Sequence, residues 1–77
     1  MKSLFIITFQ VSEWGNLTKQ AEVGAQNAVQ AEMILRKYMS SNRRSFALPA
    51  QFEIIIRETI SVGYVSTVGV LEIKTLS

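Results

Sequence analysis

The chain has 77 residues, of which 48% are hydrophobic and 18% charged, and its formal net charge at pH 7 is +2. It contains no histidine, no cysteine and no aspartate, so it lacks the usual general base, the thiolate nucleophile and most metal-ligating side chains. This composition predicts one folded domain over residues 1–77, without disulfides, metal or cofactor, and it argues against an enzyme.

The first segment with a clear period is residues 4–11. Its odd positions are all large and apolar, whereas its even positions are only half apolar. This pattern predicts a strand with one fully buried face and one half-apolar face. The apolar run is too short for the core of a signal peptide, and no stretch approaches the roughly 18 apolar residues of a membrane span. We therefore expect a cytoplasmic protein with no membrane partner.

A hairpin is predicted next. Gly15 and Asn16 supply the turn chemistry, and residues 17–23 alternate between apolar and polar side chains. Trp14 stands at the tip of this hairpin. Tryptophan is enriched at binding hot spots, so Trp14 is a candidate contact residue; alternatively, its ring folds back over the helix end or the open edge of the sheet.

Residues 26–41 have the period of an amphipathic helix. They contain neither proline nor glycine, Asn27 or Gln26 sits near the start, and Arg36 and Lys37 lie in the last turns, where cations favour the helix dipole. The apolar positions share one side of the helical wheel and are Ala28, Ala31, Ile34, Leu35, Tyr38 and Met39.

A loop over residues 42–50 holds the only proline and is long enough to adapt to a surface; a third strand follows from Phe52. Glu58 falls on the buried parity of that strand, which indicates a bulge or the edge of the sheet. Residues 70–74 form a fourth strand with Leu71 and Ile73 inward. We expect a long hairpin between these two strands, with its tip somewhere in residues 60–69.

The elements together predict an α+β fold of the ββαββ type. It has a four-stranded antiparallel sheet in the order 2-1-3-4, with one helix packed on one face. The other face collects Leu4, Ile6 and Ile55, and no element is left to cover it. We therefore expect self-association through these three residues, as a homodimer, or an obligate partner.

The densest charged feature holds four of the eight basic residues within nine positions, with no acid among them. These residues are Arg36, Lys37, Arg43 and Arg44, and Tyr38 and Phe46 lie close to them in sequence. One interpretation is a patch that contacts phosphate, with the aromatic rings stacking on bases. The other is a solvated helix end whose cations complement its carbonyl groups.

The pattern of the first half resembles a known class of small proteins. The pattern consists of an apolar first strand, a glycine-bearing turn, a polar second strand ending in Val23-Gly24-Ala25 and a helix beginning Asn27-Ala28-Val29-Gln30-Ala31-Glu32. It is similar to that of small accessory proteins of phages and plasmids. That class includes inhibitors of bacterial defence systems such as some anti-CRISPR proteins. The resemblance covers roughly the first 40 residues, is one of fold pattern, and transfers no functional residue.

Two functional hypotheses follow. The first is a non-catalytic module that acts by covering a partner protein's surface, as an inhibitor of phage or plasmid type does, with Trp14, Arg36, Lys37, Arg43 and Arg44 as its contact residues. The second is a small basic nucleic-acid-binding protein that uses the region of Arg43 and Arg44. Salt dependence separates them, because contacts to phosphate weaken steeply as salt is added.

Overall fold

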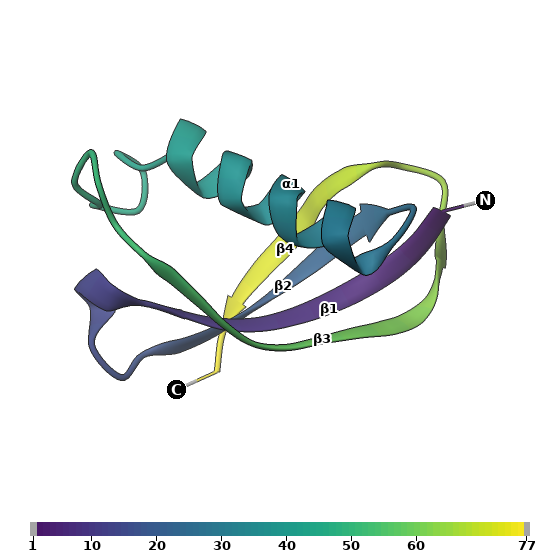
Figure 1. The fold of residues 1–77 in the computed structure, drawn as a ribbon, viewed down its shortest axis with the longest axis horizontal. Helices are drawn as coiled ribbons and strands as arrows, with labels where there is room; N and C mark the ends of the chain where they lie inside the picture. Colours follow the sequence, from purple (N-terminus) through teal and green to yellow (C-terminus); the bar gives the residue numbers. More distant parts are fainter. Residues whose placement is uncertain (1, 77) are drawn as a thin grey trace.

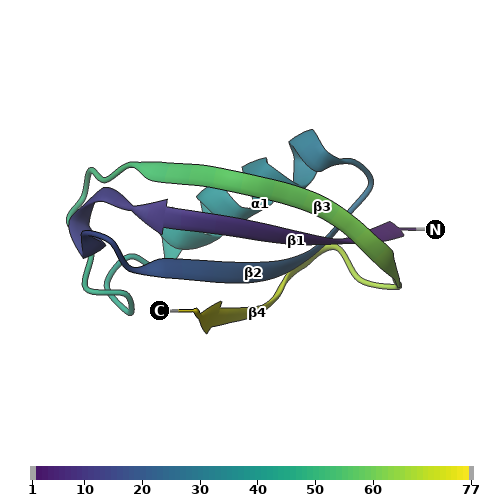
Figure 2. The ribbon, with the colours of Figure 1, turned by 90° about the horizontal axis from the view of Figure 1, so that it is seen from below.

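The computed structural model describes residues 2–76. In chain order the elements are strand β1 (Lys2–Val11), the short 3-10 helix η1 (Ser12–Trp14), strand β2 (Thr18–Ala25), helix α1 (Ala28–Ser41), strand β3 (Ile54–Val65) and strand β4 (Gly69–Thr75). The four strands form one antiparallel sheet, and α1 lies across one of its faces (Figures 1 and 2). The predicted α+β class, the ββαββ order and the single helix on one face are confirmed.

The order of strands in the sheet is β3-β1-β2-β4. The prediction of 2-1-3-4 is right that β1 lies between β2 and β3, but the position of β4 is wrong, because β4 pairs with β2 at the opposite edge. One ion pair supports this pairing: Lys74 Nζ lies 3.5 Å from the carboxylate of Glu22 on β2, and it also lies 3.3 Å from that of Glu72 on β4 itself. Lys19 on β2 also donates a hydrogen bond to Thr75 Oγ1 at 2.8 Å.

Two glycines explain why β3 and β4 do not form the predicted hairpin. The link over residues 66–68 crosses the sheet at Gly24, where a Cβ atom would collide with the carbonyl oxygen of Thr67 and with Cγ2 of Val65. Gly69, paired with Gly24, has a φ of 134°, which side chains other than glycine's rarely allow. The chain therefore passes from one edge of the sheet to the other (Figure 1).

The crossing takes place on the face away from the helix. Val23 and Ala25, on either side of Gly24 in β2, are fully buried in the core under α1. Since successive strand residues point to opposite faces, Gly24 faces the other side of the sheet. We call this other side the open face.

The core lies between the sheet and the helix. Every odd residue of β1 from Phe5 to Val11 is buried, as its alternation predicts. Helix α1 contributes three residues spaced four apart, which lie one above another on a single face. The buried apolar residues are Phe5, Ile7, Phe9, Val11, Ala21, Val23, Ala25, Ala31, Leu35, Met39 and Leu48.

The start of α1 is fixed by a side-chain cap. Asn27 has an extended backbone, and its Oδ1 accepts a hydrogen bond of 2.8 Å from the backbone N–H of Gln30. Capping of this kind satisfies one of the free N–H groups of the first turn and contributes about 1 kcal/mol. The helix therefore begins at Ala28, two residues later than predicted, and Asn27 is the cap. No helix in residues 2–76 has the length and apolar character needed to cross a membrane.

β3 is an edge strand with two irregularities. Its register against β1 shifts once beside Glu58 and again beside Gly63. The sequence predicts a bulge or the edge of the sheet at Glu58, and both are present. A third shift, between β2 and β4, leaves Leu71 as the extra residue, and its side chain is 47% exposed. The prediction that Leu71 points inward is therefore wrong, whereas Ile73 packs against the core as predicted.

The open face carries the three residues that the sequence analysis predicts to take part in self-association. Leu4 and Ile6 are even residues of β1 and point away from the helix, and Ile55 shares their face because it pairs with Gln10. All three are only partly exposed. Self-association through them stays a prediction.

Candidate functional site

A row of three aromatic rings joins the hairpin tip to the end of the helix. The ring of Trp14 in η1 lies 6.1 Å, centre to centre, from that of Phe46, and Phe46 lies 6.2 Å from Tyr38 in α1. These distances are typical of favourable aromatic pairs. Trp14 is thus half-buried against the loop that follows the helix, which agrees with the alternative in which its ring folds back.

The loop that carries the two arginines is held by its own backbone. The carbonyl of Tyr38 accepts hydrogen bonds from the backbone N–H and from the side-chain amide of Asn42. The carbonyl of Arg43 accepts from the backbone N–H of Phe46 at 3.2 Å and from that of Leu48 at 2.8 Å. Leu48 is buried in the core. The loop is therefore closed and anchored, not the adaptable segment that the sequence suggests.

The far end of this loop is tied to the hairpin tip. The backbone N–H of Ser12 donates to the carbonyl of Glu53 at 3.0 Å, and the hydroxyl of Ser12 accepts from the N–H of Glu53 at 3.3 Å. Hairpin tip, loop and helix end consequently form one connected surface, although they are far apart in sequence.

Five cations belong to this surface. Arg36, Lys37 and Arg44 are exposed, Arg43 is partly buried, and Lys19 Nζ lies over the Trp14 ring at 4.9 Å from its centre. Lys19 is not among the contact residues predicted from the sequence. The feature that indicates it is its position in the same hairpin, five residues after Trp14. We call residues 12–19 and 36–53 together the basic end.

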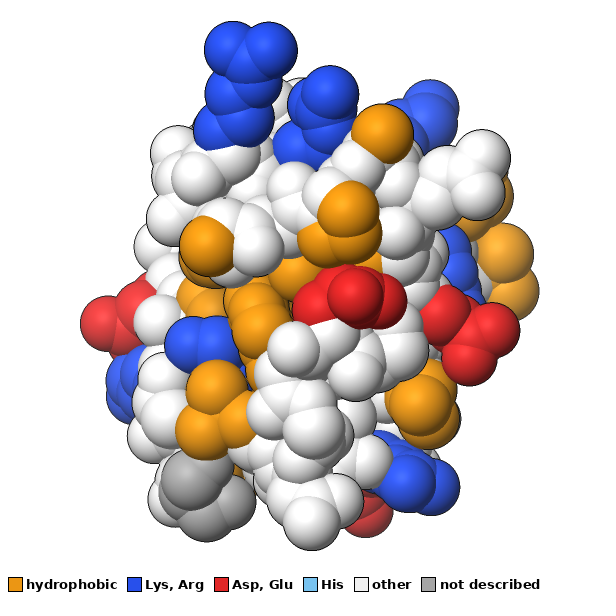
Figure 3. Space-filling model, turned by 90° about the vertical axis from the view of Figure 1, so that its left-hand side faces the viewer, with side chains coloured by type: hydrophobic (Ala, Val, Ile, Leu, Met, Phe, Trp, Pro, Cys, Tyr) orange, Lys and Arg blue, Asp and Glu red, His pale blue; other side chains and the backbone are white. Residues whose placement is uncertain are grey.

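The cations of the basic end have no carboxylate partner within residues 2–76, where the ion pairs are those of Lys74. The basic end has five cations against two acids, a net charge of +3, whereas the remaining residues have three cations against four acids, a net charge of −1. Figure 3 looks onto this end and shows Lys and Arg side chains along its upper margin, above hydrophobic ones. The small overall charge therefore conceals an uneven distribution, with the excess of positive charge at the basic end.

The structure brings Trp14 to the loop that carries Arg43 and Arg44, through the contact of its ring with Phe46. Arg36 and Lys37 lie on α1, next in sequence to Tyr38, whose ring also contacts Phe46. Exposed guanidinium groups can bind carboxylates or phosphates in a bidentate way. No group of three or more metal-ligating side chains occurs in the described part of the chain.

Comparison of this chain with known protein families, with curated sequences and with solved structures yields no match. The geometry of the basic end therefore carries the functional conclusion.

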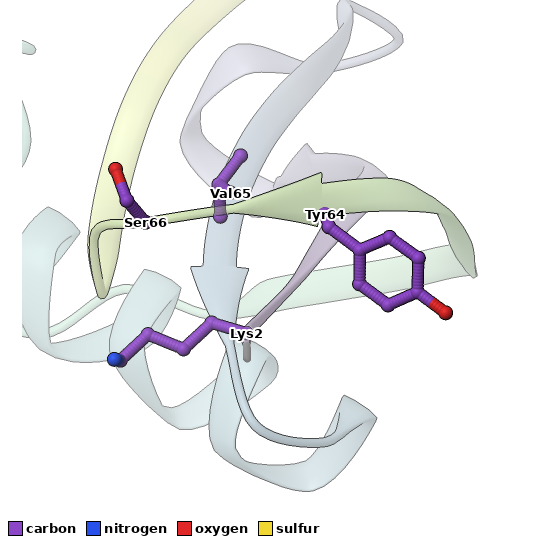
Figure 4. A pocket seen from close by; sticks show the side chains of 4 residues that line it. All are labelled: Lys2, Tyr64, Val65 and Ser66. Atoms are coloured by element: carbon purple, nitrogen blue, oxygen red, sulfur yellow. The ribbon is translucent and has the colours of Figure 1, made fainter.

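A shallow hollow of ≈ 570 Å³ lies at the opposite end of the molecule, lined by Lys2, Tyr64, Val65 and Ser66. Figure 4 shows Lys2 and Tyr64 extending to different sides, so they do not converge on a common ligand position. The hollow includes none of the predicted contact residues.

Proposed function

We propose that this chain is a small non-catalytic protein-binding module whose basic end docks on an acidic surface of a partner protein. The observation that carries the proposal is a set of five cations without carboxylate partners at the end of the molecule that also holds three packed aromatic rings. Unpaired cations are available to a partner, and complementary charge speeds encounter and selects the partner.

Rigidity of the loop supports this assignment. Arg43 and Arg44 sit on a segment closed by backbone hydrogen bonds and anchored by buried Leu48. Such a surface loses little conformational entropy on binding, so more of the interaction energy appears as affinity. Arginine, tyrosine and tryptophan are also the residues most often found at binding hot spots.

Covering a partner's surface is a mode of action that needs no catalytic group. It is the mode implied by the resemblance to phage and plasmid inhibitors, and the lack of histidine, cysteine and aspartate agrees with it. The basic end offers charge for orientation and half-exposed aromatic area for contact.

The same cations suit phosphate, so binding to nucleic acid is the second candidate. Sequence-tolerant binding to single strands relies on aromatic faces that are free to stack on bases. Here Lys19 lies over the Trp14 ring, and Phe46 is tilted against both of its aromatic neighbours. With few free ring faces and a net charge of only +3 at this end, the geometry favours an acidic protein surface over a nucleic acid.

Trp14 is the only tryptophan in the chain, so its fluorescence reports binding at the basic end directly. We would titrate the protein at low salt with a glutamate-rich peptide and with mixed-sequence single- and double-stranded DNA. The proposal expects the peptide to change the Trp14 emission. Arg43→Glu combined with Arg44→Glu should weaken this binding about tenfold, since two charge interactions at the protein surface together contribute roughly 1 to 2 kcal/mol.

A charge control accompanies this test. Arg44→Glu alone and Lys2→Glu change the net charge equally, but Lys2 is the first residue of β1, and the start of β1 lies at the other end of the molecule (Figure 1). Only Arg44→Glu should therefore weaken the peptide complex. Tighter binding to DNA than to the peptide, lost at moderate salt, would establish the second candidate instead. Unfolding of the double variant, or no response to either probe, would remove the assignment.

A further inference from the structure

The outer edge of β3 is long and, in its second half, carries neither charge nor proline. Natural edge strands are kept from pairing by charges, proline, short length or bulges that twist the edge away. β3 is 12 residues long, and residues 59–65 contain neither charge nor proline. Ile60, Val62 and Tyr64 are 44%, 51% and 73% exposed along this stretch. Such an edge is a template for a strand that matches its bulges.

The first irregularity of β3 lies near its start. Phe9 of β1 pairs with Ile56 and Thr8 pairs with Glu58, so Arg57 is an extra residue. A bulge of this kind sets two residues of one strand opposite a single residue of the other. Arg57 and Glu58 therefore lie together on the open face, and the guanidinium of Arg57 donates to Gln10 Oε1, which belongs to that face.

The second irregularity repeats the first nearer the end of the strand. Phe5 pairs with Ser61 and Leu4 with Gly63, so Val62 is the extra residue. Val62 and Gly63 accordingly lie opposite the single residue Leu4, on the open face.

The two bulges are placed symmetrically about Ile60. Arg57 and Gly63 are each three residues from it, and Glu58 and Val62 are each two residues from it. The face pattern of β3 is consequently the same in both directions. Positions 56, 59, 61 and 64 face the helix side, and positions 55, 57, 58, 60, 62, 63 and 65 face the open side.

We propose that a second copy of this chain pairs with the outer edge of β3, antiparallel, about a two-fold axis through Ile60. In this register every residue from 55 to 65 meets a residue of the second copy on the same face, and bulge lies opposite bulge. The result is a continuous eight-stranded sheet with both helices on one side. A regular strand of another protein has no bulges at this spacing, which is why we assign the edge to a second copy.

The side chains that meet across this axis are compatible. Ile60 would contact Ile60 of the second copy, and Ile56 would lie opposite its Tyr64, a pairing of aromatic and β-branched residues that stabilises antiparallel strands. No like charges meet, because Arg57 faces glycine and Glu58 faces valine in the second copy. The pairing covers the most exposed apolar side chains of the strand.

This interface differs from self-association through Leu4, Ile6 and Ile55. Only Ile55 takes part in it, opposite Val65 of the second copy, whereas Leu4 and Ile6 lie on the neighbouring strand β1 and keep their exposure. The interface is also independent of the basic end, so failure of one proposal leaves the other intact.

Sedimentation of single lysine variants tests the register. Wild type should sediment as a dimer at about 100 µM, a concentration that detects even weak association. Ile60→Lys sets two ammonium groups opposite each other and should weaken the dimer at least tenfold, as should Ile60→Glu. An equimolar mixture of these two variants should recover a dimer. The matched control Val62→Lys faces Glu58 of the second copy and should keep the dimer.

Cysteine cross-linking gives a second readout in a chain that has no native cysteine. Paired strand residues have Cα atoms about 4.5 to 5.5 Å apart, within the range that a disulfide spans. Ile60→Cys should therefore cross-link to a covalent dimer on mild oxidation, and Val62→Cys should not.

Three outcomes would overturn the proposal. They are a monomeric wild type, equal cross-linking of the two cysteine variants, and dissociation by Ile6→Lys but not by Ile60→Lys. Circular dichroism verifies that each variant is folded, and the cysteine variants decide the matter if a lysine variant is not.

Discussion

Replacement of Gly24 by alanine is the most direct test of the path of the chain between β3 and β4. A Cβ atom at this position would meet the backbone carbonyl of Thr67 and Cγ2 of Val65. The valine methyl can rotate away, but the carbonyl belongs to the main chain and moves only if the whole link moves. The variant therefore strains the crossing or detaches it.

The expected cost follows from this contact. Overpacking a filled site by one carbon costs about 1 to 3 kcal/mol, and we expect the upper part of this range because a main-chain atom must move. In a domain of this size, 1 kcal/mol corresponds to about 4 to 8 °C in Tm. Gly24→Ala should thus lower Tm by about 12 to 24 °C at a loss of about 3 kcal/mol.

Gly63→Ala is the matched control. It lies in the neighbouring part of the same sheet, a Cβ atom there has no neighbour within 4 Å, and its backbone is not in the left-handed region. Alanine restricts the unfolded chain, so this variant should be as stable as wild type or up to about 1 kcal/mol more stable. Thermal melts of both variants by circular dichroism, at one protein concentration, measure the difference.

Equal melting temperatures for the two variants would refute the reasoning. They would mean that the link does not pass over Gly24 and that β4 forms the hairpin with β3 that the sequence pattern predicts. Amide contacts by NMR between Glu22 and Glu72, which are paired residues of β2 and β4, provide an independent measurement.

Three further changes test individual stabilising features. Asn27→Ala removes the cap of α1 and should lower the free energy of unfolding by about 1 kcal/mol, measured by urea denaturation. Ala47→Gly should raise it by about 0.5 to 1 kcal/mol, since Ala47 has a φ of 56° and glycine adopts the left-handed region without a steric cost. The pKa of Lys74 is raised above its usual 10.5 by the carboxylate of Glu72, through a hydrogen bond and its charge, and by the carboxylate of Glu22. A raised pKa stabilises the fold below the unfolded value, so Lys74→Gln should melt slightly below wild type at pH 7, and the difference should disappear as the pH rises through the pKa of Lys74.

The parts of the fold that sequence reasoning predicts correctly depend on local patterns. The alternation of Phe5, Ile7 and Phe9 identifies the central strand, because a strand buried between two neighbours shows its period in its own residues. The broken parity at Glu58 likewise reveals a bulge, and Asn27 is a recognisable helix cap. In each case the cause and its effect lie within a few residues of each other.

No local pattern of residues indicates which strand β4 pairs with. Residues 70–74 alternate in the same way whether the strand pairs with β2 or with β3. The choice rests on the lack of a Cβ at Gly24 beneath Thr67 and on the contact between Lys74 and Glu22, which join distant parts of the chain.

The same limit applies to the candidate site. The cluster of cations is visible in the sequence, but the position of Trp14 depends on Phe46, and the part played by Lys19 depends on Trp14. The rigidity of the arginine loop depends on its backbone hydrogen bonds and on the burial of Leu48, and no periodic pattern in the sequence indicates either.

The pairing of the last strand with β2 also has a consequence for how the chain folds. Lys19 and Thr75, which bond across this pair, are 56 positions apart, and the paired residues of β1 and β3 are also far apart in sequence. Only the first hairpin and the helix can form from nearby residues, so most of the sheet must close large loops, and we expect folding in milliseconds to seconds instead of microseconds. During synthesis at roughly 5 to 20 residues per second, β2 exposes a bare edge for seconds until β4 emerges. The pairing of β4 with β2 thus ends the interval in which this edge of the sheet is open to aggregation.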